Sequence, residues 1–397
     1  MIRHLLKLTW NRKRTNALII LEIFFSFLVV FGVVTMGVFL WNNYRSPLGF
    51  SWQNVWNVQV VLQNREEEVD PRHAETFARL LEEVRSMPAV EAAAGSELPP
   101  YLNGAWIGTW DFKGIGPVEM EIDNVTAGLD KVLGLNLVEG RGFEKGDEAL
   151  AWDPVVIDQD LARAVYGGES PVGKQFGNPD PKETPRRVIG VVSDYRKAGE
   201  LSANTNFMFQ LNRLRESDRP PGNILIRVRP GTTARFEETL VARLHALAPQ
   251  ASFEIKPMEE MRAANFRERL APLAVGGIVA FFLLLMVGLG LIGVLWQNLL
   301  QRTRELGLRR ATGASRSSIQ TQLVLEQLLL TSFGVLLGTV LVLQIPILDL
   351  IGFVSEGVFA AGLIVSMIVI FLLALLCAVH PSQMASRVPP AEALRYE

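Results

Sequence analysis

Four long apolar runs constrain the fold of this chain more than any other feature of its sequence. They occupy residues 17–41, 271–297, 323–348 and 358–380. Each run has roughly 20 residues or more, which is enough for a helix to cross a hydrocarbon core about 30 Å thick. Buried helices of soluble proteins rarely stay apolar on every face over such a length. We therefore predict four transmembrane helices, with a long and mostly polar segment between the first and the second.

Positive charge predicts the side of the membrane on which each segment lies. Lys and Arg gather before the first run, between the second and third runs and after the fourth, whereas the link at 349–357 has neither. Lys and Arg are retained on the cytoplasmic side, so we expect both termini and the loop at 298–322 to be cytoplasmic. Residues 42–270 would then lie outside the cytoplasm.

The predicted fold is an α-helical membrane protein with four transmembrane helices plus a large α+β extracytoplasmic domain inserted between the first and second helices. The first run is too long for the core of a cleaved signal peptide, which favours a retained anchor. The predicted segments are a cytoplasmic interfacial helix at 1–16, transmembrane helix 1 at 17–41, the extracytoplasmic domain at 42–270, transmembrane helix 2 at 271–297, a cytoplasmic loop at 298–322, transmembrane helix 3 at 323–348, a short extracytoplasmic loop at 349–357, transmembrane helix 4 at 358–380 and a cytoplasmic tail at 381–397.

The polar segment mixes strand and helix patterns. Branched and aromatic runs predict strands at 56–62, 118–125, 155–158, 188–193, 224–228 and 252–255. Apolar spacing predicts helices at 73–87, at 233–247 and at 258–269, the last continuing into the second apolar run. Strand–helix–strand units near 56–95 and 223–256 would enclose an inserted middle portion. The turn-rich stretch at 178–187 predicts a loop.

Composition excludes several classes of function. The formal net charge is −2, so nothing indicates nucleic acid as a partner. The single cysteine, Cys377, lies in the fourth run, so the exported domain has no disulfide. The four histidines are scattered, no two of them have metal-ligand spacing, and we expect no metal site. We find no catalytic constellation either, so we expect the chain not to be an enzyme.

Residues 168–174 have the G-x-x-x-x-G-K spacing of a nucleotide-binding P-loop. The next residue is Gln175, not the Ser or Thr that would hold Mg²⁺, and the segment before it, 161–166, has a helix pattern rather than a strand pattern. The segment is also predicted to lie on the extracytoplasmic side of the membrane, where ATP is absent. We interpret it as a surface turn and expect no cofactor in this chain.

Two glutamates, Glu22 and Glu326, fall inside the apolar runs near their cytoplasmic ends. Ionisable residues within the membrane are candidates for function. At this depth a side chain can reach the interface, so we predict helix packing or partner contact for both glutamates rather than a proton relay.

The loop between the second and third runs carries the clearest mechanistic signal. From 301 to 315 it reads QRTRELGLRRATGAS. This pattern predicts an extension of the second transmembrane helix, then a short basic helix, then a turn at Gly313. Charge alone leaves two interpretations open, namely positive-inside charge that contacts lipid phosphates and a docking helix for a cytoplasmic partner.

The same loop resembles the loop after the second span in permeases of the MacB/FtsX-like ABC transporter family. Glu326 with Gly334 and Gly338 matches the family's glutamate-then-glycine pattern, and the ending P-A-E-A-L-R-Y-E is similar to its P-x-x-A-L-R-x-E. In the exported domain, G-R-G-F, P-V-G-K and V-I-G-V-V-S-D resemble the family's G-R-x-F, P-I-G-K and V-I-G-V-V-x-D segments. Thr312 departs from the Leu or Met that is usual before the glycine.

The resemblance implies that a separate ATP-binding subunit docks on residues 304–315. The residues expected to couple to this ATPase are Arg304, Glu305, Gly307, Arg309, Arg310, Gly313 and Ser315. The residues expected to serve packing or coupling within the membrane are Glu22, Glu326, Gly334 and Gly338. Such families include members with a fused ATPase domain, which this sequence does not show, so ATP and Mg²⁺ would be bound by the partner chain.

The resemblance also implies a mechanotransmission permease of the cell inner membrane. Two ATPase copies and a second permease chain, identical or related, would move the exported domain within surrounding membrane lipid. We expect efflux of peptides, antibiotics or other amphiphiles, with an adaptor protein on the exported domain. The alternative is a non-transporting scaffold that activates a periplasmic enzyme or relays a signal. The size of the exported domain favours efflux.

Overall fold

The computed structural model describes residues 13–62, 71–112, 114–177, 184–215, 218–348 and 354–387. These residues form two compact units. The soluble unit is Asn43–Glu268, and the helical unit comprises the described residues before and after it. The predicted interfacial helix lies mostly outside the described residues, as do most of the predicted tail and of the short link at 349–357. Residues 13–16 belong to the first long helix and not to a separate interfacial one.

Four helices are long and apolar enough to cross a membrane, among the ranges just given. They are α2 (Lys13–Arg45), α7 (Met258–Ala311), α8 (Arg316–Val342) and α10 (Glu356–Arg387), with a short α9 (Gln344–Ile347) between the last two. The predicted number of apolar helices is confirmed. The predicted continuity of α7 is confirmed as well, since one unbroken helix runs through the predicted boundary between the extracytoplasmic domain and the second transmembrane helix, near residue 270.

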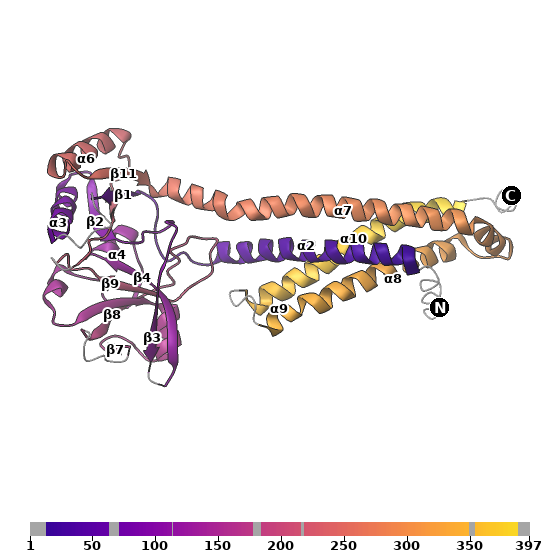
Figure 1. Cartoon of the computed structure of the whole chain (residues 1–397), viewed down its shortest axis with the longest axis horizontal. Helices are drawn as coiled ribbons and strands as arrows, with labels where there is room; N and C mark the ends of the chain where they lie inside the picture. The colour runs from indigo at the N-terminus through magenta and orange to yellow at the C-terminus, as the bar shows by residue number, and fades with distance from the viewer. Residues whose placement is uncertain are drawn as a thin grey trace. The chain divides into compact units, whose positions relative to one another are not determined.

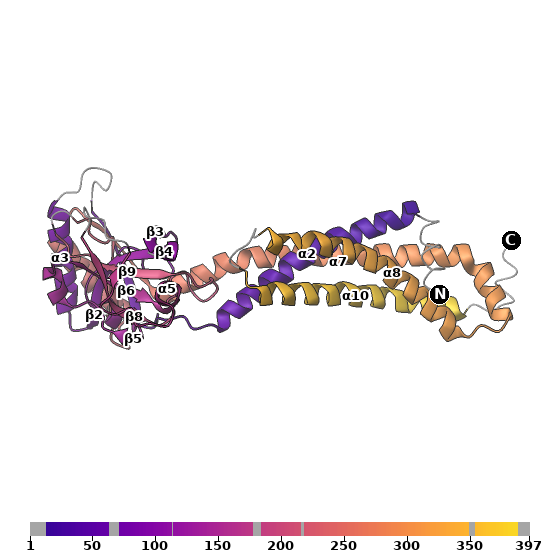
Figure 2. The same ribbon diagram turned by 90° about the horizontal axis from the view of Figure 1, so that it is seen from below.

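The helical unit has an apolar core to which all four long helices contribute. Ile23 and Phe27 of α2, Val287 of α7, Val335 of α8 and Ala374 of α10 are buried in it. Figures 1 and 2 both show α8 and α10 running side by side, and these two helices are in contact. The core explains why the apolar runs carry no polar stripe, because one side of each helix faces its neighbours and the rest would face lipid.

The described residues of the soluble unit form one sheet of eleven strands. The strands are β1 (Val55–Val61), β2 (Val90–Ser96), β3 (Trp106–Phe112), β4 (Gly116–Val125), β5 (Leu137–Gly140), β6 (Asp153–Asp158), β7 (Gln175–Phe176), β8 (Arg186–Val192), β9 (Phe207–Leu211), β10 (Asn223–Val228) and β11 (Ser252–Pro257). Their order is β11-β1-β10-β2-β4-β9-β6-β8-β5, with β3 on β4 and β7 on β8.

Strands from the two ends of the soluble unit's sequence form one antiparallel half of the sheet. In this half β1 pairs with β10 and β11, and β10 pairs with β2. Helices α3 (Pro71–Ser86) and α6 (Ala234–Leu247) pack on it and on each other, as Figure 1 shows. Phe77, Leu80, Leu244 and Ile224 lie in the shared core. The predicted strand–helix–strand units at the two ends, with a middle portion inserted between them, are confirmed.

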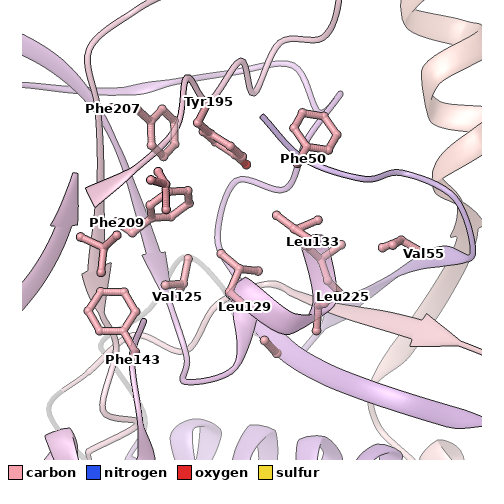
Figure 3. Close-up of a cluster of buried hydrophobic side chains, with 14 of the residues drawn as sticks. Phe50, Val55, Val125, Leu129, Leu133, Phe143, Tyr195, Phe207, Phe209 and Leu225 are labelled. Carbon is pink, nitrogen blue, oxygen red and sulfur yellow. The ribbon is translucent and has the colours of Figure 1, made fainter. Parts of the chain in front are cut away.

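The inserted middle portion forms the other half of the sheet, with parallel pairing of β4 with β9 and of β6 with β8. The two halves meet at a single paired position, Ser96 opposite Val125. Short helices α4 (Leu129–Leu133), η1 (Lys145–Ala149) and α5 (Gln159–Tyr166) join the strands. A second core crosses the meeting point of the halves. Figure 3 shows Phe207, Phe209 and Tyr195 of this core packed together.

The P-loop look-alike follows a helix, as predicted. Helix α5 ends at Tyr166, and Lys174 Nζ bonds to Glu169 Oε2 at 2.6 Å while lying 5.5 Å from the centre of the Tyr166 ring. The lysine therefore closes a local turn. The loop predicted at 178–187 needs a correction, because Arg186 and Arg187 are the first residues of β8, while 178–183 lie outside the described residues.

Candidate coupling site

Helix α7 meets α8 in a tight elbow at the end of the basic segment. α7 ends at Ala311, Gly313 has a φ of 100°, and α8 begins at Arg316. Glycine adopts a positive φ without the steric cost that a Cβ brings. The turn predicted at Gly313 is confirmed. The short basic helix predicted before it is the uninterrupted end of α7.

Hydrogen bonds close both sides of the elbow. The main-chain N–H of Ala314 donates to the carbonyl oxygen of Arg309 at 2.9 Å. This bond spans the glycine and is the usual ending of a helix that has a left-handed glycine after its last turn. Ser315 Oγ accepts from the N–H of Ser318 at 3.2 Å, which satisfies one of the free donors at the start of α8.

An apolar cluster holds the two helices together just beyond the elbow. Its members are Leu295 and Leu299 from α7 and Ile319 and Leu323 from α8, all of them buried. Together with the capped turn, this cluster fixes the angle between the helices. A displacement applied to the elbow would therefore pass to both α7 and α8.

A chain of side-chain hydrogen bonds links the end of α7 to the third apolar helix. Arg309 Nη1 donates to Gln322 Oε1 at 3.0 Å, and Gln322 Nε2 donates to Glu326 Oε1 at 3.0 Å. Gln322 and Glu326 are four residues apart on α8 and so lie on one face. The guanidinium of Arg309, predicted from the sequence to contact an ATPase, is thus bonded within the chain and orients the elbow.

Two further residues predicted for ATPase coupling, Gly313 and Ser315, are exposed. Their neighbours Thr312 and Arg316 are exposed as well, and Leu308 is 57% exposed. The backbone of Arg304, Glu305, Gly307 and Arg310 belongs to α7, and the placement of their side chains lies outside what the structure describes. Leu308 is therefore an exposed apolar residue within a basic stretch of the sequence.

Three of the four predicted membrane residues, Glu22, Gly334 and Gly338, lie at close helix contacts of α2, whereas Glu326 accepts a hydrogen bond from Gln322 on its own helix α8. A Cβ on Gly334 would be 2.7 Å from Ile23 Cγ2, and a Cβ on Gly338 would overlap the ring of Phe27. Glu22 Oε2 would be 2.8 Å from a Cβ on Gly290 of α7. The glycines therefore let α7 and α8 approach α2 closely, as small residues do between membrane helices.

Sequence reasoning missed Gln322, which joins Arg309 to Glu326. Its signal was a polar residue four positions before an intramembrane glutamate, a spacing that places both side chains on one helix face. Among the residues that the structure describes, no three His, Cys, Asp or Glu side chains are grouped so that they could hold a metal ion.

Four apolar helices together with a large α+β unit define a multi-pass membrane protein with a substantial soluble domain. The family model for the MacB-like periplasmic core domain matches residues 17–243, and the model for the FtsX-like permease C-terminal domain matches residues 277–390. The chain belongs to the MacB/FtsX-like family of ABC transporter permeases.

Several proteins of this family resemble the chain along much of its length. It is 26% identical over 287 residues to the uncharacterized ABC transporter permease YknZ of Bacillus subtilis, covering 70% of each chain. It is 26% identical to the macrolide export ATP-binding/permease protein MacB of Bordetella avium, covering 67% of this chain and 42% of the relative. The chain thus spans less than half the length of that relative. The pyoverdine export ATP-binding/permease protein PvdT of Pseudomonas aeruginosa is 25% identical over 272 residues, which cover 66% of this chain and 40% of that protein.

A solved structure also matches part of the chain. The crystal structure of the periplasmic region of MacB from Actinobacillus actinomycetemcomitans aligns with a TM-score of 0.37 and 17% identity. The match covers 54% of this chain and 92% of that one.

Proposed function

We propose that this chain is the permease subunit of an ABC transporter and couples ATP hydrolysis by a separate cytoplasmic ATPase to movement of its soluble unit. The observation that carries the proposal is the single helix α7. It begins directly after strand β11 of the soluble unit and ends at the basic elbow, with 54 residues in all. A helix of that length spans roughly 80 Å at about 1.5 Å per residue. It is long enough to connect a cytoplasmic partner with a domain on the far side of a membrane.

The elbow is the surface on which the ATPase would act. Its turn is capped on both sides and its helices share a buried cluster, so it would move as one piece with α7 and α8. Exposed Leu308 and the arginines of the segment supply apolar and cationic contacts. In this arrangement the docking residues are Arg304, Glu305, Arg310 and Leu308, while Arg309 positions them through Gln322.

The arrangement implies a topology and a set of partners. Positive charge favours cytoplasmic termini and a cytoplasmic elbow. In this topology the soluble unit, inserted between the first and second apolar helices, would lie on the outer side of the cell inner membrane. Two ATPase subunits would bind ATP and Mg²⁺, and a second permease chain, identical or related, would complete the complex. An adaptor protein on the soluble unit would continue the path outward.

Efflux of amphiphiles is the activity that the relatives favour. Two of them are named for export, one of macrolides and one of pyoverdine. The second candidate is a scaffold that moves a partner enzyme without carrying a substrate. The apolar character of the four helices favours it, because the described helices place few ionisable groups where a polar solute would pass.

Complementation of a deletion strain tests efflux directly. Cells that lack the chain should accumulate a fluorescent macrolide derivative, and the wild-type chain should restore its energy-dependent loss. The Arg309→Glu/Arg310→Glu variant should reach the membrane in equal amount and fail to restore it. If the deletion changes cell-wall hydrolysis and leaves accumulation of macrolides and peptides untouched, the scaffold role replaces efflux.

A further inference from the structure

One loop of the soluble unit is bonded both to the end of α2 and to the start of α7. It comprises residues 193–206, between β8 and β9, and we call it the joint loop. From 194 to 202 it reads DYRKAGELS, which has the charge of a solvent-exposed loop. Arg196, Lys197 and Glu200 are nevertheless buried. Buried charges are costly unless partners satisfy them, so their partners reveal what the loop does.

Arg196 binds the end of α2. Its side chain is 2% exposed, and Nη1 donates to the main-chain oxygens of Asn43 at 2.7 Å and Ser46 at 3.2 Å. Asn43 Nδ2 donates in return to the carbonyl of Leu201 at 3.4 Å. The last carbonyls of a helix have no partner within the helix and form the negative end of its dipole. The joint loop thus supplies a cationic cap to α2 from a residue 153 positions later in the chain.

The same guanidinium shapes the joint loop itself. Arg196 Nη2 donates to the carbonyl oxygen of Glu200 at 2.7 Å and also to that of Ser202. One side chain therefore gathers four carbonyl oxygens, two from the α2 end and two from the loop. Lysine could not reproduce this geometry, because its single ammonium group is not a planar fork.

Glu200 binds the start of α7. Its Oε1 accepts from Arg262 Nε at 2.5 Å, and its Oε2 accepts from the hydroxyl of Tyr101 at 3.2 Å. The guanidinium of Arg262 lies 4.7 Å from the centre of the Trp52 ring and 4.6 Å from that of Phe266. The backbone of Glu200 is thus bonded to the residue that caps α2, and its side chain is bonded to α7.

Close packing leaves little freedom around these bonds. A Cβ on Gly49 would overlap the carbonyl oxygen of Asp194, and a Cβ on Gly199 would lie 2.7 Å from Tyr101 Cε1. Tyr44 of α2 and Phe266 of α7 also meet edge to face, with ring centres 6.2 Å apart. The two helix ends therefore contact each other as well as the loop.

We infer that the joint loop ties α2 and α7 into one moving element where they enter the soluble unit, with Arg196 and Glu200 as its positioning residues. The inference rests on the proposed coupling function and adds to it. A displacement carried by α7 would enter the domain together with α2, through β8 and β9, the two strands that flank the loop. α2 is therefore part of the moving element and does not serve only as an anchor.

Paired spin labels on the full-length chain, copurified with its ATPase in nanodiscs, test this directly. Both labels go on exposed positions of the soluble unit, one at residue 45 and one at residue 264, in a Cys377→Ser background. The wild type should give one narrow distance distribution that is the same in nucleotide-free and ATP-trapped samples. In Arg196→Met the distribution should broaden and become nucleotide-dependent, while ATP hydrolysis continues at more than half the wild-type rate and substrate export falls about tenfold.

Arg213→Met is the matched control. The side chain of Arg213, in the same unit, is 8% exposed, donates to Asp153 and to the carbonyl oxygen of Trp152, and is remote in sequence from both helix ends. It should lower the stability of the unit and leave the label distances and export per folded molecule unchanged. Glu200→Gln should loosen the α7 side alone, and Arg196→Lys should restore part of the narrow distribution.

The outcomes separate the joint from the proposed function. If no ATPase copurifies with the wild type, the coupling function fails, and the label distances still test the joint in the isolated chain. If ATPase binds and Arg196→Met keeps the narrow distribution and normal export, the joint is contradicted and the function stands. Should Arg196→Met not fold, Glu200→Gln and Arg262→Gln carry the same test.

Discussion

Gly338 of α8 lies against Phe27 of α2 so closely that a Cβ at position 338 would overlap the aromatic ring. The equivalent contact one turn earlier brings Gly334 against Ile23. Glycine normally weakens a helix, so its presence at both contacts indicates that close approach of the helices outweighs helix propensity there.

Alanine substitutions at glycines should therefore change stability in opposite directions. Gly338→Ala should lower the thermal stability of the detergent-solubilised chain, by about 1–3 kcal/mol, because it overpacks the helix contact. Gly293→Ala on α7, where a Cβ meets nothing within 4 Å, should raise stability by about 0.5–1 kcal/mol. Tryptophan fluorescence melting curves measure both. Equal effects of the two substitutions would contradict the packing.

Two tyrosines of the soluble unit should respond differently to loss of their hydroxyls. Tyr195 is fully buried, and its hydroxyl has no hydrogen-bond partner among the described residues, whereas Tyr101 donates to Glu200. Tyr195→Phe should be neutral or stabilise the unit by about 1 kcal/mol, because a buried unpaired hydroxyl costs free energy. Tyr101→Phe should destabilise by about 1–2 kcal/mol, since it leaves a buried carboxylate oxygen without its donor. Urea unfolding of residues 43–268 compares the two, and a larger loss for Tyr195→Phe would overturn the assignment.

The soluble unit should become less stable as pH rises from about 4 to 7, because the buried side chain of Asp158 resists losing its proton. Burial raises the pKa of Asp158 to about 7, although the main-chain N–H groups of Leu161 and Phe207 donate to it. In the unfolded chain an aspartate titrates near pH 4, so the folded state holds the extra proton between these values. The free energy of unfolding then falls with pH, by up to about 1.4 kcal/mol for each unit of pKa shift.

Two asparagine substitutions give opposite results in this titration. Asp158→Asn should raise stability at pH 8 and reduce the fall of the unfolding free energy between pH 4 and 8. The fall that remains is due to Asp123, because burial also raises the pKa of Asp123, to about 6. Asp147→Asn should lower stability at neutral pH, because hydrogen bonding to Arg141 lowers the pKa of Asp147 and stabilises its charged form. Urea midpoints across this pH range measure both slopes. A wild-type midpoint that rises steadily towards pH 8 would refute the assignment to Asp158.

Removal of the Gln322 side-chain amide should weaken ATPase binding, although Gln322 itself would not contact the ATPase. Gln322→Leu removes the hydrogen bond between Arg309 Nη1 and Gln322 Oε1, so the docking helix loses part of its fixed orientation. We expect the amount of ATPase retained in a pull-down to fall about fivefold, which corresponds to a loss of about 1 kcal/mol in binding free energy. The same substitution at Gln297, which is exposed on α7, should leave it unchanged. Equal retention by both variants would show that Arg309 acts only at the surface.

Much of this fold follows from sequence patterns that local physics controls. Apolar runs longer than a buried soluble helix predicted the four membrane helices, and a glycine after a basic helix predicted the turn at Gly313, where the structure has a positive φ. Patterns in the antiparallel half of the soluble unit were interpreted correctly too, because α3 and α6 each have one apolar face and β1 and β10 are rich in branched residues.

The sequence did not predict the parts that depend on distant contacts. β3 is mostly exposed, and only its second half, Thr109 to Phe112, alternates between polar and apolar residues. β9 is a five-residue, mostly apolar segment that periodicity alone cannot assign. The joint loop was missed for a different reason. Arg196 is satisfied by main-chain carbonyls, which leave no trace in the identity of the residues that carry them.

The measurement that tests the account most directly is affinity purification of the full chain from its native membrane, beside the Arg309→Glu/Arg310→Glu variant. The account predicts that an ATP-binding subunit copurifies with the wild type, hydrolyses ATP in the complex and is lost from the double variant. Absence of any ATPase from the wild-type preparation under gentle detergent would contradict coupling. The basic elbow would then be a topology signal that contacts lipid phosphates.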